Sequence, residues 1–353
     1  MRPLNRAWST VSAMGLSLRD RGWRLFDQIV ECAPLRETNP WTAVDDALAF
    51  APDYATLERL LGVPVYLGAT SQSGVPALAL DVWVSYELRR AGFDGDRVWP
   101  RATEPRVIPV EVTQFVAGLP AKLRAEVDAR LAEGKVVGAA KSANLLGKNY
   151  VKQVDVVMSS WATGPELMIS TKRMDSSFGK NAANRVEESY GDAKNLRLRH
   201  PQAALGFVYA LNAVALVREK DTAMWLIDLL QKLGREDDAY DAVALLMPDL
   251  RDDEELAGAE EPEAAGPLEA GAIDEEVGNR EDTGEATSDD VDQVIPVSLY
   301  SEEVPPALDP GRFFAVMCAR ILDNSPINFH PRARELRAAA ASPTAAGSDL
   351  LGP

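Results

Sequence analysis

Two neighbouring apolar runs in this chain carry residues that an ordinary hydrophobic core excludes. Residues 151–158 and 167–169 are rich in Val, Met, Leu and Ile, and a short turn containing Gly and Pro lies between them. This pattern predicts two adjacent strands. Asp155 interrupts the first run, and the second continues into Ser170-Thr171-Lys172. Because an unpaired charge is costly to bury, we expect these polar residues to be present for chemistry.

The geometry of a strand supports that expectation. Side chains alternate between the two faces of a sheet, so Ser170 and Lys172 should share one face while Thr171 points to the other. If the strand that holds Asp155 pairs with this one, a carboxylate, a hydroxyl and an ammonium meet at one end of the sheet. Such a group can bind a divalent cation and water. The simpler alternative is a structural ion pair between Asp155 and Lys172, with Ser170 as a hydrogen-bond donor.

These residues resemble the motif of the PD-(D/E)xK nucleases, the superfamily that holds most Type II restriction endonucleases. The family motif has an Asp at the start of one strand and an acidic residue, any residue and Lys on the next, which correspond here to Asp155 and to Ser170-Thr171-Lys172. The chain departs from the motif twice. Val154 replaces the usual Pro, and Ser170 replaces the second carboxylate, which removes a metal ligand. The resemblance covers about residues 148–217.

A subset of these enzymes has S-x-K and restores the carboxylate with a Glu on the following helix. Glu187 is the matching residue here, although its spacing from Lys172 is slightly long. Helical periodicity places Glu187 at the edge of the sheet-facing stripe and turns Glu188 toward solvent or DNA. The stripe that we predict consists of Ala183, Val186, Tyr190 and Ala193.

The resemblance implies a fold and an activity. The implied fold is an α/β/α sandwich with a small mixed central sheet, and the implied activity is metal-dependent hydrolysis of phosphodiester bonds in DNA, as in restriction enzymes. Asp155 and Glu187 would hold Mg²⁺, for which Mn²⁺ can substitute. Lys172 would orient or deprotonate the attacking water, and Ser170 would hydrogen-bond to metal-bound water.

The segment after Lys172 is unusually polar for one that adjoins two core strands. Cationic and amide side chains near the start of a helix suit a phosphate backbone, through direct ion pairs and through the free N–H groups of the helix. A solvated helix face is the alternative interpretation. The candidate DNA-binding residues are Arg173, Lys180, Asn181, Asn184 and Arg185.

The net charge of −17 argues against nucleic acid binding until it is divided along the chain. Residues 1–235 hold 30 Lys and Arg against 26 Asp and Glu, residues 236–310 hold 2 against 25, and residues 311–353 hold 5 against 3. The acidity therefore belongs to one segment, and within it the composition of residues 252–292 predicts disorder because this stretch cannot bury enough apolar area to fold. This segment is a solubilising linker or a mimic that competes with DNA for a basic groove.

The rest of the chain divides into regions by composition and periodicity. Residues 1–134 are predicted to be mostly helical and are a candidate for target recognition, with a basic run around Trp99. Residues 135–250 form the predicted nuclease core with flanking helices, which include 202–217, 223–233 and 237–247. A disordered acidic linker at 251–293, a strand and helix at 294–337 and a disordered tail at 338–353 complete the division. In the first region we predict helices at 17–32, 43–50, 54–61, 77–90 and 120–132, a short edge strand at 63–67, and a basic run of Arg89, Arg90, Arg97, Arg101 and Arg106.

Several other chemistries lack the residues that they need. The chain has 2 His and 2 Cys, too few and too scattered for a His-based nuclease, a zinc ribbon or a disulfide framework. No apolar run approaches a membrane span, so we expect a cytoplasmic protein with no membrane contact. The expected partner is double-stranded DNA, and a homodimer and a cognate methyltransferase are further candidates.

Two other functional hypotheses stay open at this point. The chain could be a DNA-binding or scaffold subunit of a defence complex whose nuclease centre has decayed, for which Ser170 in place of an acidic residue is the best argument. It could also be a repair or mobile-element nuclease of the same fold, which would prefer DNA structures or ends to a fixed sequence.

Overall fold

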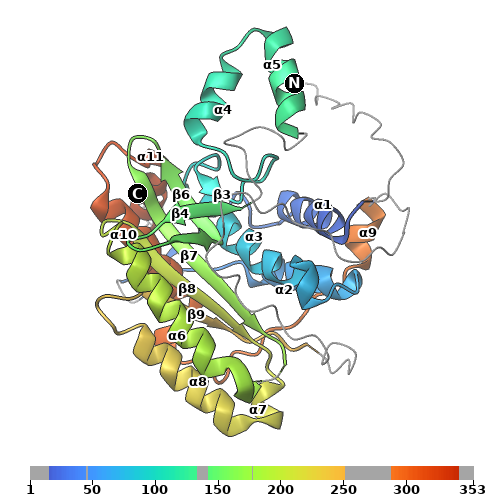
Figure 1. The fold of residues 1–353 in the computed structure, drawn as a ribbon, viewed down its shortest axis with the longest axis vertical. Helices are drawn as coiled ribbons and strands as arrows, with labels where there is room; N and C mark the ends of the chain where they lie inside the picture. The colour runs from blue at the N-terminus through green and yellow to red at the C-terminus, as the bar shows by residue number, and fades with distance from the viewer. Residues whose placement is uncertain (1–15, 45–46, 133–141, 177, 251–287, 342–353) are drawn as a thin grey trace, which may run out of the picture.

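A five-stranded mixed sheet forms the centre of the molecule (Figure 1). The structure, a computed structural model, describes residues 16–44, 47–132, 142–176, 178–250 and 288–341. The strands lie in the order β3-β6-β7-β8-β9. Their bounds are β3 Val98–Trp99, β6 Val156–Ser160, β7 Gly164–Met174, β8 Ala204–Leu211 and β9 Ala242–Leu246.

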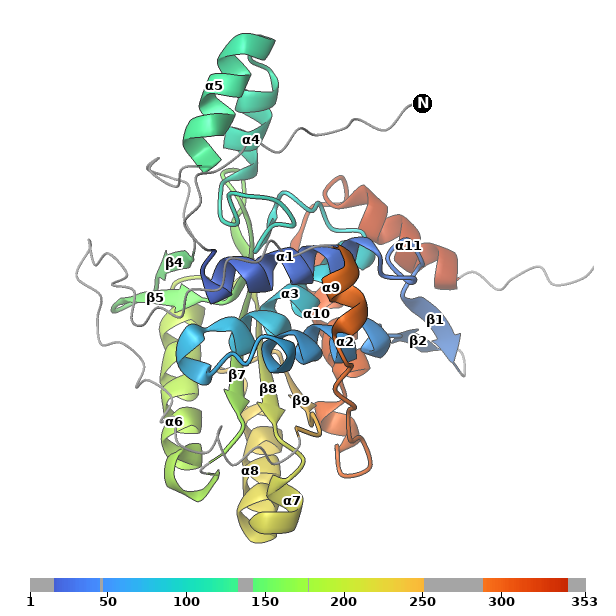
Figure 2. The same cartoon turned by 90° about the vertical axis from the view of Figure 1, so that its right-hand side faces the viewer.

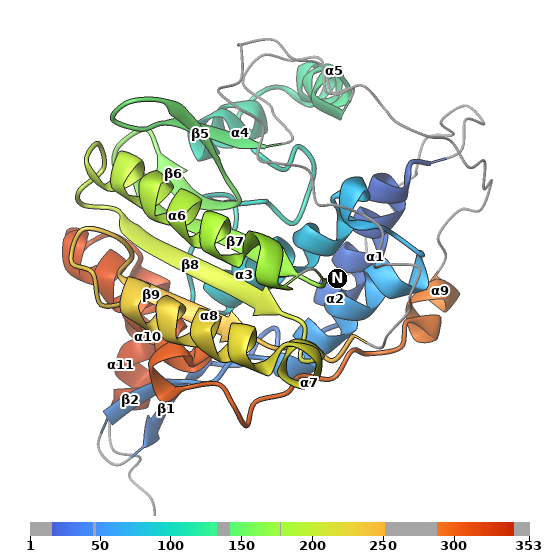
Figure 3. The same ribbon diagram turned by 60° about the horizontal axis from the view of Figure 1, so that its bottom comes forward.

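The sheet is antiparallel on one side and parallel on the other. β3 pairs antiparallel with β6, and β6 with β7, whereas β7, β8 and β9 run parallel. Parallel neighbours need crossover connections, which α6 (Phe178–Arg197) and α8 (Lys220–Leu233) supply. Figure 3 shows α6 and α8 side by side over one face of the sheet.

Strand β8 illustrates how the sequence fills both layers. Phe207 and Tyr209 belong to the hydrophobic cluster under α6 and α8, whereas Val208 and Ala210 belong to the cluster on the other face. Gly206 faces α10 (Pro310–Asn324), and a Cβ at this position would lie 2.8 Å from the ring of Phe313. The glycine therefore lets α10 pack directly on the sheet.

The second face of the sheet is covered by helices from both ends of the chain. α3 (Val75–Arg90) contacts β6 and β7, and α10 contacts β7, β8 and β9. Two N-terminal helices, α1 (Leu18–Glu31) and α2 (Tyr54–Tyr66), pack on α3 and share its hydrophobic cluster. α3 is buried almost all round, as expected for a helix enclosed between a sheet and two other helices.

Several smaller helices and hairpins lie around the central sheet and its covering helices. α4 and α5 project from it and form a small cluster of their own (Figure 2). Two hairpins, β1–β2 and β4–β5, lie apart from the central sheet. The bounds of these and the remaining elements are β1 Trp41–Val44, β2 Ala47–Phe50, η1 Ser71–Ser73, α4 Val110–Ala117, α5 Ala121–Ala132, β4 Ala143–Leu146, β5 Val151–Val154, α7 Ala215–Arg218, α9 Ser288–Gln293, η3 Pro306–Leu308 and α11 Pro331–Ala341.

Most of the predicted elements near the site are confirmed, and two predicted helices are wrong. The second part of the first apolar run pairs antiparallel with the second run, with Val156 opposite Ile169, and α8 and α10 lie where helices were expected. The first run is broken at Asp155, because its residues 151–154 form β5 and pair with β4 outside the central sheet. Residues 202–217 and 237–247, however, contain β8 and β9. Parallel strands that are covered on both faces have continuous apolar sequences, and periodicity alone does not distinguish such a run from a buried helix.

Three further predictions fail in the outer layer. The described parts of 43–50 belong to the β1–β2 hairpin, and the edge strand predicted at 63–67 is instead the end of α2. The strand predicted at 294–300 is reduced to a single bridge between Pro248 and Leu299. Most of the predicted acidic linker and tail lies outside the described residues, but the described 288–293 form α9, which contacts α1. The fold is thus mixed α/β, with helices on both faces of a central mixed sheet.

Candidate active site

Asp155 and Lys172 lie close together on neighbouring strands. Asp155 occupies the bend between β5 and β6, and the β6–β7 register places it beside the Ser170–Lys172 segment. The backbone N–H of Thr171 donates to Asp155 Oδ2 at 2.8 Å. Although part of Asp155 reaches solvent, loss of hydration raises its pKa, against the opposing effects of the Thr171 N–H and of Lys172 and Lys152.

The expected alternation along β7 is present. Ser170 and Lys172 lie on the side of α6, and Thr171 lies on the side of α3, where its hydroxyl donates to Asp81 Oδ1 at 2.6 Å. Asp81 is buried in the middle of α3. Burial and the charge of Asp155 raise the pKa of Asp81 well above its usual value, and the Thr171 hydrogen bond only partly opposes them.

The helix carboxylate that meets Lys172 is Glu188, the residue next to the predicted Glu187. Lys172 Nζ lies 3.8 Å from Glu188 Oε1, whereas Glu187 is exposed. The predicted stripe is partly confirmed: Val186 and Ala193 are buried and Tyr190 is half-buried, whereas Ala183 is exposed and its neighbour Ala182 is buried. The stripe that packs inward consists of Ala182, Val186, Ser189, Ala193 and Leu196.

A second lysine and a third carboxylate extend the group. Lys152 on β5 lies 3.4 Å from the same Glu188 Oε1 and 2.5 Å from Asp192 Oδ2. The hydroxyl of Tyr150 donates to Asp192 Oδ1 at 2.9 Å. Burial alone would lower the pKa of Lys152, but the hydrogen bond to Asp192 and the nearby carboxylates raise it. The ion pairs therefore form a continuous group, in which Lys152 on β5 contacts Asp192 and Glu188 on α6, and Glu188 contacts Lys172 on β7.

Ser170 is more enclosed than its proposed role suggested. Ser170 is only 8% exposed and lies on the side of the sheet that α6 covers. It neighbours Tyr240, whose hydroxyl donates to the carbonyl of Ser189 at 2.9 Å. Burial raises the pKa of Tyr240, and the interaction with Ser170 opposes that rise. Ser170 thus lies in the layer between β7 and α6, beside Tyr240.

The structure separates the predicted DNA-binding residues. Arg173 is buried on the α3 side, where it pairs with Asp175 at 2.6 Å and donates to the carbonyl of Pro76 at 3.2 Å, so it does not face the site. Its position follows from alternation, since Arg173 has the parity of Thr171. On α6, Asn184 is exposed and Arg185 is half-buried. The side chains of Lys180 and Asn181 lie outside the described residues.

The basic run around Trp99 is also largely committed to internal ion pairs. Arg90 pairs with Glu87 at 2.6 Å, Arg101 with Asp96 at 2.6 Å, and Arg106 with Asp27 at 2.7 Å. All three arginines are buried. These partners argue against the suggestion that the run forms a DNA-binding surface.

The carboxylates near Lys172 can be tested against the Mg²⁺ site that the resemblance implies. No group of three or more His, Cys, Asp or Glu suited to a metal exists within the described part of the chain. Glu188 lies 3.8 Å from Lys172, and Lys172 is near enough to Asp155 to act against the rise of its pKa. Mg²⁺ is commonly held by one or two carboxylates together with substrate phosphates and water. Asp155 and Glu188 are the carboxylates that would hold such an ion here, whereas Glu187 is exposed.

The sequence contained weak indications of the residues that were missed. Asp81 is the one charged residue in an otherwise apolar stretch from residue 75 to 86, and Lys152 interrupts the same apolar run as Asp155. Glu188 and Asp192 are separated by four residues, so they share a helix face. None of these patterns reveals which partner each residue meets.

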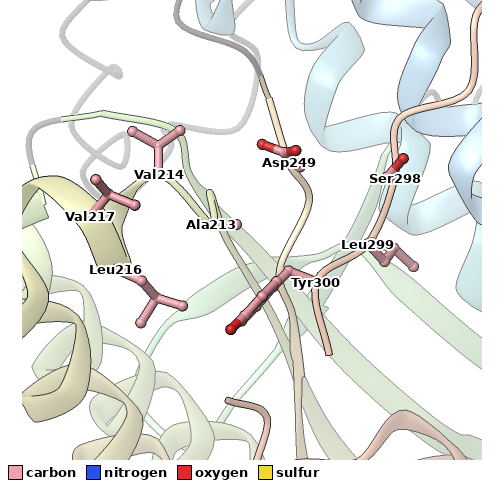
Figure 4. Close-up of a pocket in the computed structure, with 8 residues that line it drawn as sticks. All are labelled: Ala213, Val214, Leu216, Val217, Asp249, Ser298, Leu299 and Tyr300. Carbon is pink, nitrogen blue, oxygen red and sulfur yellow. The ribbon is translucent and has the colours of Figure 1, made fainter. Parts of the chain in front are cut away.

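A separate pocket of about 410 Å³ lies beyond the ends of β8 and β9 (Figure 4). Its lining combines the aliphatic Val214, Leu216 and Val217 with Tyr300 and Asp249. Ligands often bind at the carboxyl ends of parallel strands, but none of the charged residues around Lys172 lines this pocket. It therefore takes no part in the chemistry considered below.

Comparison with protein-family models, with curated proteins and with solved structures finds no match to this chain. Among the helices of the described residues, none has the length and apolarity needed to cross a bilayer.

Proposed function

We propose that the chain is a metal-dependent DNA endonuclease of the restriction type that acts in host defence. One observation carries the proposal: Lys172 is close to two carboxylates, because it lies 3.8 Å from Glu188 on the following helix and acts electrostatically on Asp155, which precedes β6. An Asp at the start of one strand and a Lys on the next, in a mixed sheet covered by helices, also support a restriction-endonuclease-like fold. Double-stranded DNA is the proposed substrate, and the cytoplasm the proposed location.

In this proposal each residue of the site has a distinct role. Asp155 and Glu188 would hold Mg²⁺, which when bound supplies charge stabilisation at the phosphate and at the leaving oxygen. Lys172, whose side chain is 23% exposed, would orient the attacking water through a hydrogen bond. The Thr171 N–H fixes one oxygen of Asp155 and so aims the carboxylate. Ser170 would support Lys172 from below.

The reaction that these groups serve is a displacement at phosphorus. The water oxygen forms a new bond to phosphorus and gives up one proton to solvent, the bond from phosphorus to one sugar oxygen breaks, and the leaving oxygen takes up a proton from solvent. The protein contributes mainly position and charge, because the reacting atoms belong to water and DNA.

Incubation of supercoiled plasmid with the full chain and Mg²⁺ tests the proposal. We expect discrete fragments from the wild type and a loss of at least ~100-fold in cleavage rate for Lys172→Ala. Lys232→Ala is the control, since it removes a lysine that pairs with Asp228 on the exposed face of α8, and it should cleave normally. Duplex binding without cleavage by the wild type would overturn the proposal in favour of a DNA-binding subunit.

A further inference from the structure

Asn195 holds the β4–β5 hairpin against α6, together with the bonds of Lys152 and Tyr150 to Asp192. Asn195 Oδ1 accepts from the N–H of Asn149 at 2.8 Å, and its Nδ2 donates to the carbonyl of Tyr150 at 3.1 Å. The N–H of Lys148 donates to the Asn195 carbonyl at 2.8 Å. A Cβ on Gly147 would lie 2.1 Å from Asn195 Nδ2, so only glycine permits this approach. These contacts fix the position of the hairpin relative to α6.

This attachment brings Lys152 to the centre of the candidate site. β5 enters the site directly before Asp155, and the ammonium of Lys152 approaches the same oxygen, Glu188 Oε1, that Lys172 approaches. The side chain of Lys152 is 20% exposed and that of Lys172 is 23% exposed. The two lysines therefore reach one carboxylate from different strands with similar access to solvent.

The charge of the site on the α6 side of β7 shows what Lys152 contributes. The three carboxylates of Asp155, Glu188 and Asp192 face the two ammonium groups of Lys152 and Lys172, which leaves one negative charge. Lys152 therefore supplies one of the two positive charges that an incoming phosphate can meet on this side of β7.

A purely structural role explains less of this arrangement. If Lys152 only neutralised Asp192, an apolar pair in the same place would stabilise the fold at least as well, since buried ion pairs add little to stability. Neutralising Asp192 would also not require the Lys152 ammonium to lie within reach of Glu188 and beside Lys172.

We propose that Lys152 is a second catalytic lysine, which binds the phosphate undergoing cleavage while Lys172 orients the water. The inference rests on the proposed nuclease function and extends it to a residue outside the motif. Lys152 acts as a charge delivered by the β4–β5 hairpin, and Asn195 acts as the positioning residue that holds the hairpin in place.

Steady-state cleavage of a duplex oligonucleotide in Mg²⁺ tests this role. We expect Lys152→Met to lower kcat about 100-fold and Lys152→Arg to recover at least about tenfold of that loss, because Arg keeps the charge. Lys148→Met is the matched control, since Lys148 is an exposed lysine on the same hairpin, and it should retain wild-type kcat. Thermal unfolding of each variant establishes that it is folded.

The double variant Lys152→Met/Asp192→Asn separates catalysis from structural neutralisation. If Lys152 binds phosphate, the double variant stays as inactive as Lys152→Met. If Lys152 only compensates Asp192, removing both charges restores most of the activity, and the inference is overturned. Wild-type kcat in Lys152→Met also overturns it and leaves the nuclease proposal intact, whereas the absence of cleavage by the wild type overturns the nuclease proposal and the inference together.

Discussion

The two faces of β7 use charge in opposite ways. Toward α3, Thr171 and Arg173 are buried, and their polar atoms are bonded to Asp81, Asp175 and the carbonyl of Pro76. Toward α6, Lys172 and its carboxylate partner Glu188 are partly exposed and lie 3.8 Å apart, which is looser than a direct hydrogen bond. Polar groups on the first face are satisfied within the protein, whereas those on the second can still accept an outside partner. The second face is therefore the one to which we assign the proposed binding and catalysis.

Glu188→Gln should produce the largest effect and should act on activity alone. We expect a loss of about 100-fold to 1,000-fold in kcat, because the substitution removes a charge beside Lys172 and a proposed metal ligand. Glu187→Gln changes the neighbouring exposed carboxylate of the same helix and should stay within about twofold of wild type. Equal losses in both variants would contradict the assignment of Glu188 over Glu187.

Arg173→Met tests the opposite face and should act on stability. The substitution leaves Asp175 and the Pro76 carbonyl without their buried partner, so we expect the free energy of unfolding to fall by about 3 kcal/mol. Urea denaturation measures the loss. Cleavage per folded molecule should remain near wild type, and a selective loss of cleavage would show that the two faces are not independent.

The stability of the fold should depend on pH through Glu87, a buried carboxyl group on α3. Burial raises the pKa of Glu87 to about 7, although Arg90 and the N–H of Asp53 oppose the shift. A carboxyl group whose folded pKa exceeds its unfolded value stabilises the fold below the unfolded pKa, and that contribution is lost as pH rises through the folded pKa. The contribution of Glu87 should therefore decline between about pH 4.5 and 7, by about 3 kcal/mol in total.

Glu87→Gln isolates this contribution. The difference between wild type and variant in the free energy of unfolding, measured by urea denaturation from pH 5 to pH 8, should shift against the wild type as pH rises. A constant difference across the series would mean that Glu87 keeps one charge state throughout and that its ion pair with Arg90, at 2.6 Å, dominates over burial.

Asn195→Ala is expected to have the smallest effect on stability and a distinctive effect on the site. Loss of its side-chain bonds to Asn149 and Tyr150 should cost about 1 kcal/mol. Hydrogen exchange should increase in residues 143–154, while β8 and β9 keep their protection. An unchanged hairpin would show that the Lys152–Asp192 pair suffices to hold it.

The strands that hold Asp155 and Lys172 could be predicted because the features that define them, a turn and side-chain alternation, act over a few residues. The two apolar runs lie on either side of a Gly-Pro turn, and alternation then fixes Ser170 and Lys172 on one face and Thr171 on the other. The polar composition after Lys172 favoured a DNA-binding role for Arg173, but the same alternation places Arg173 with Thr171, where it is buried and paired with Asp175.

Helix phase and long-range partners lay beyond what periodicity could decide. Ala183 and Ala182 are equally apolar, so the sequence did not reveal which of them packs inward, and this single choice exchanged Glu187 for Glu188. β8 and β9 were predicted to be helices because a strand covered on both faces has no alternation.

The amino-acid sequence by itself determined which short segments form strands around Asp155 and Lys172, since chain direction and side-chain alternation act over a few residues. Only the tertiary structure decided that Glu188, Lys152, Asp192 and Asp81 gather around them, from α6, β5 and α3. The physical reason is that charges act through space at distances of a few ångströms, which depend on how helices and hairpins pack and not on their separation along the chain.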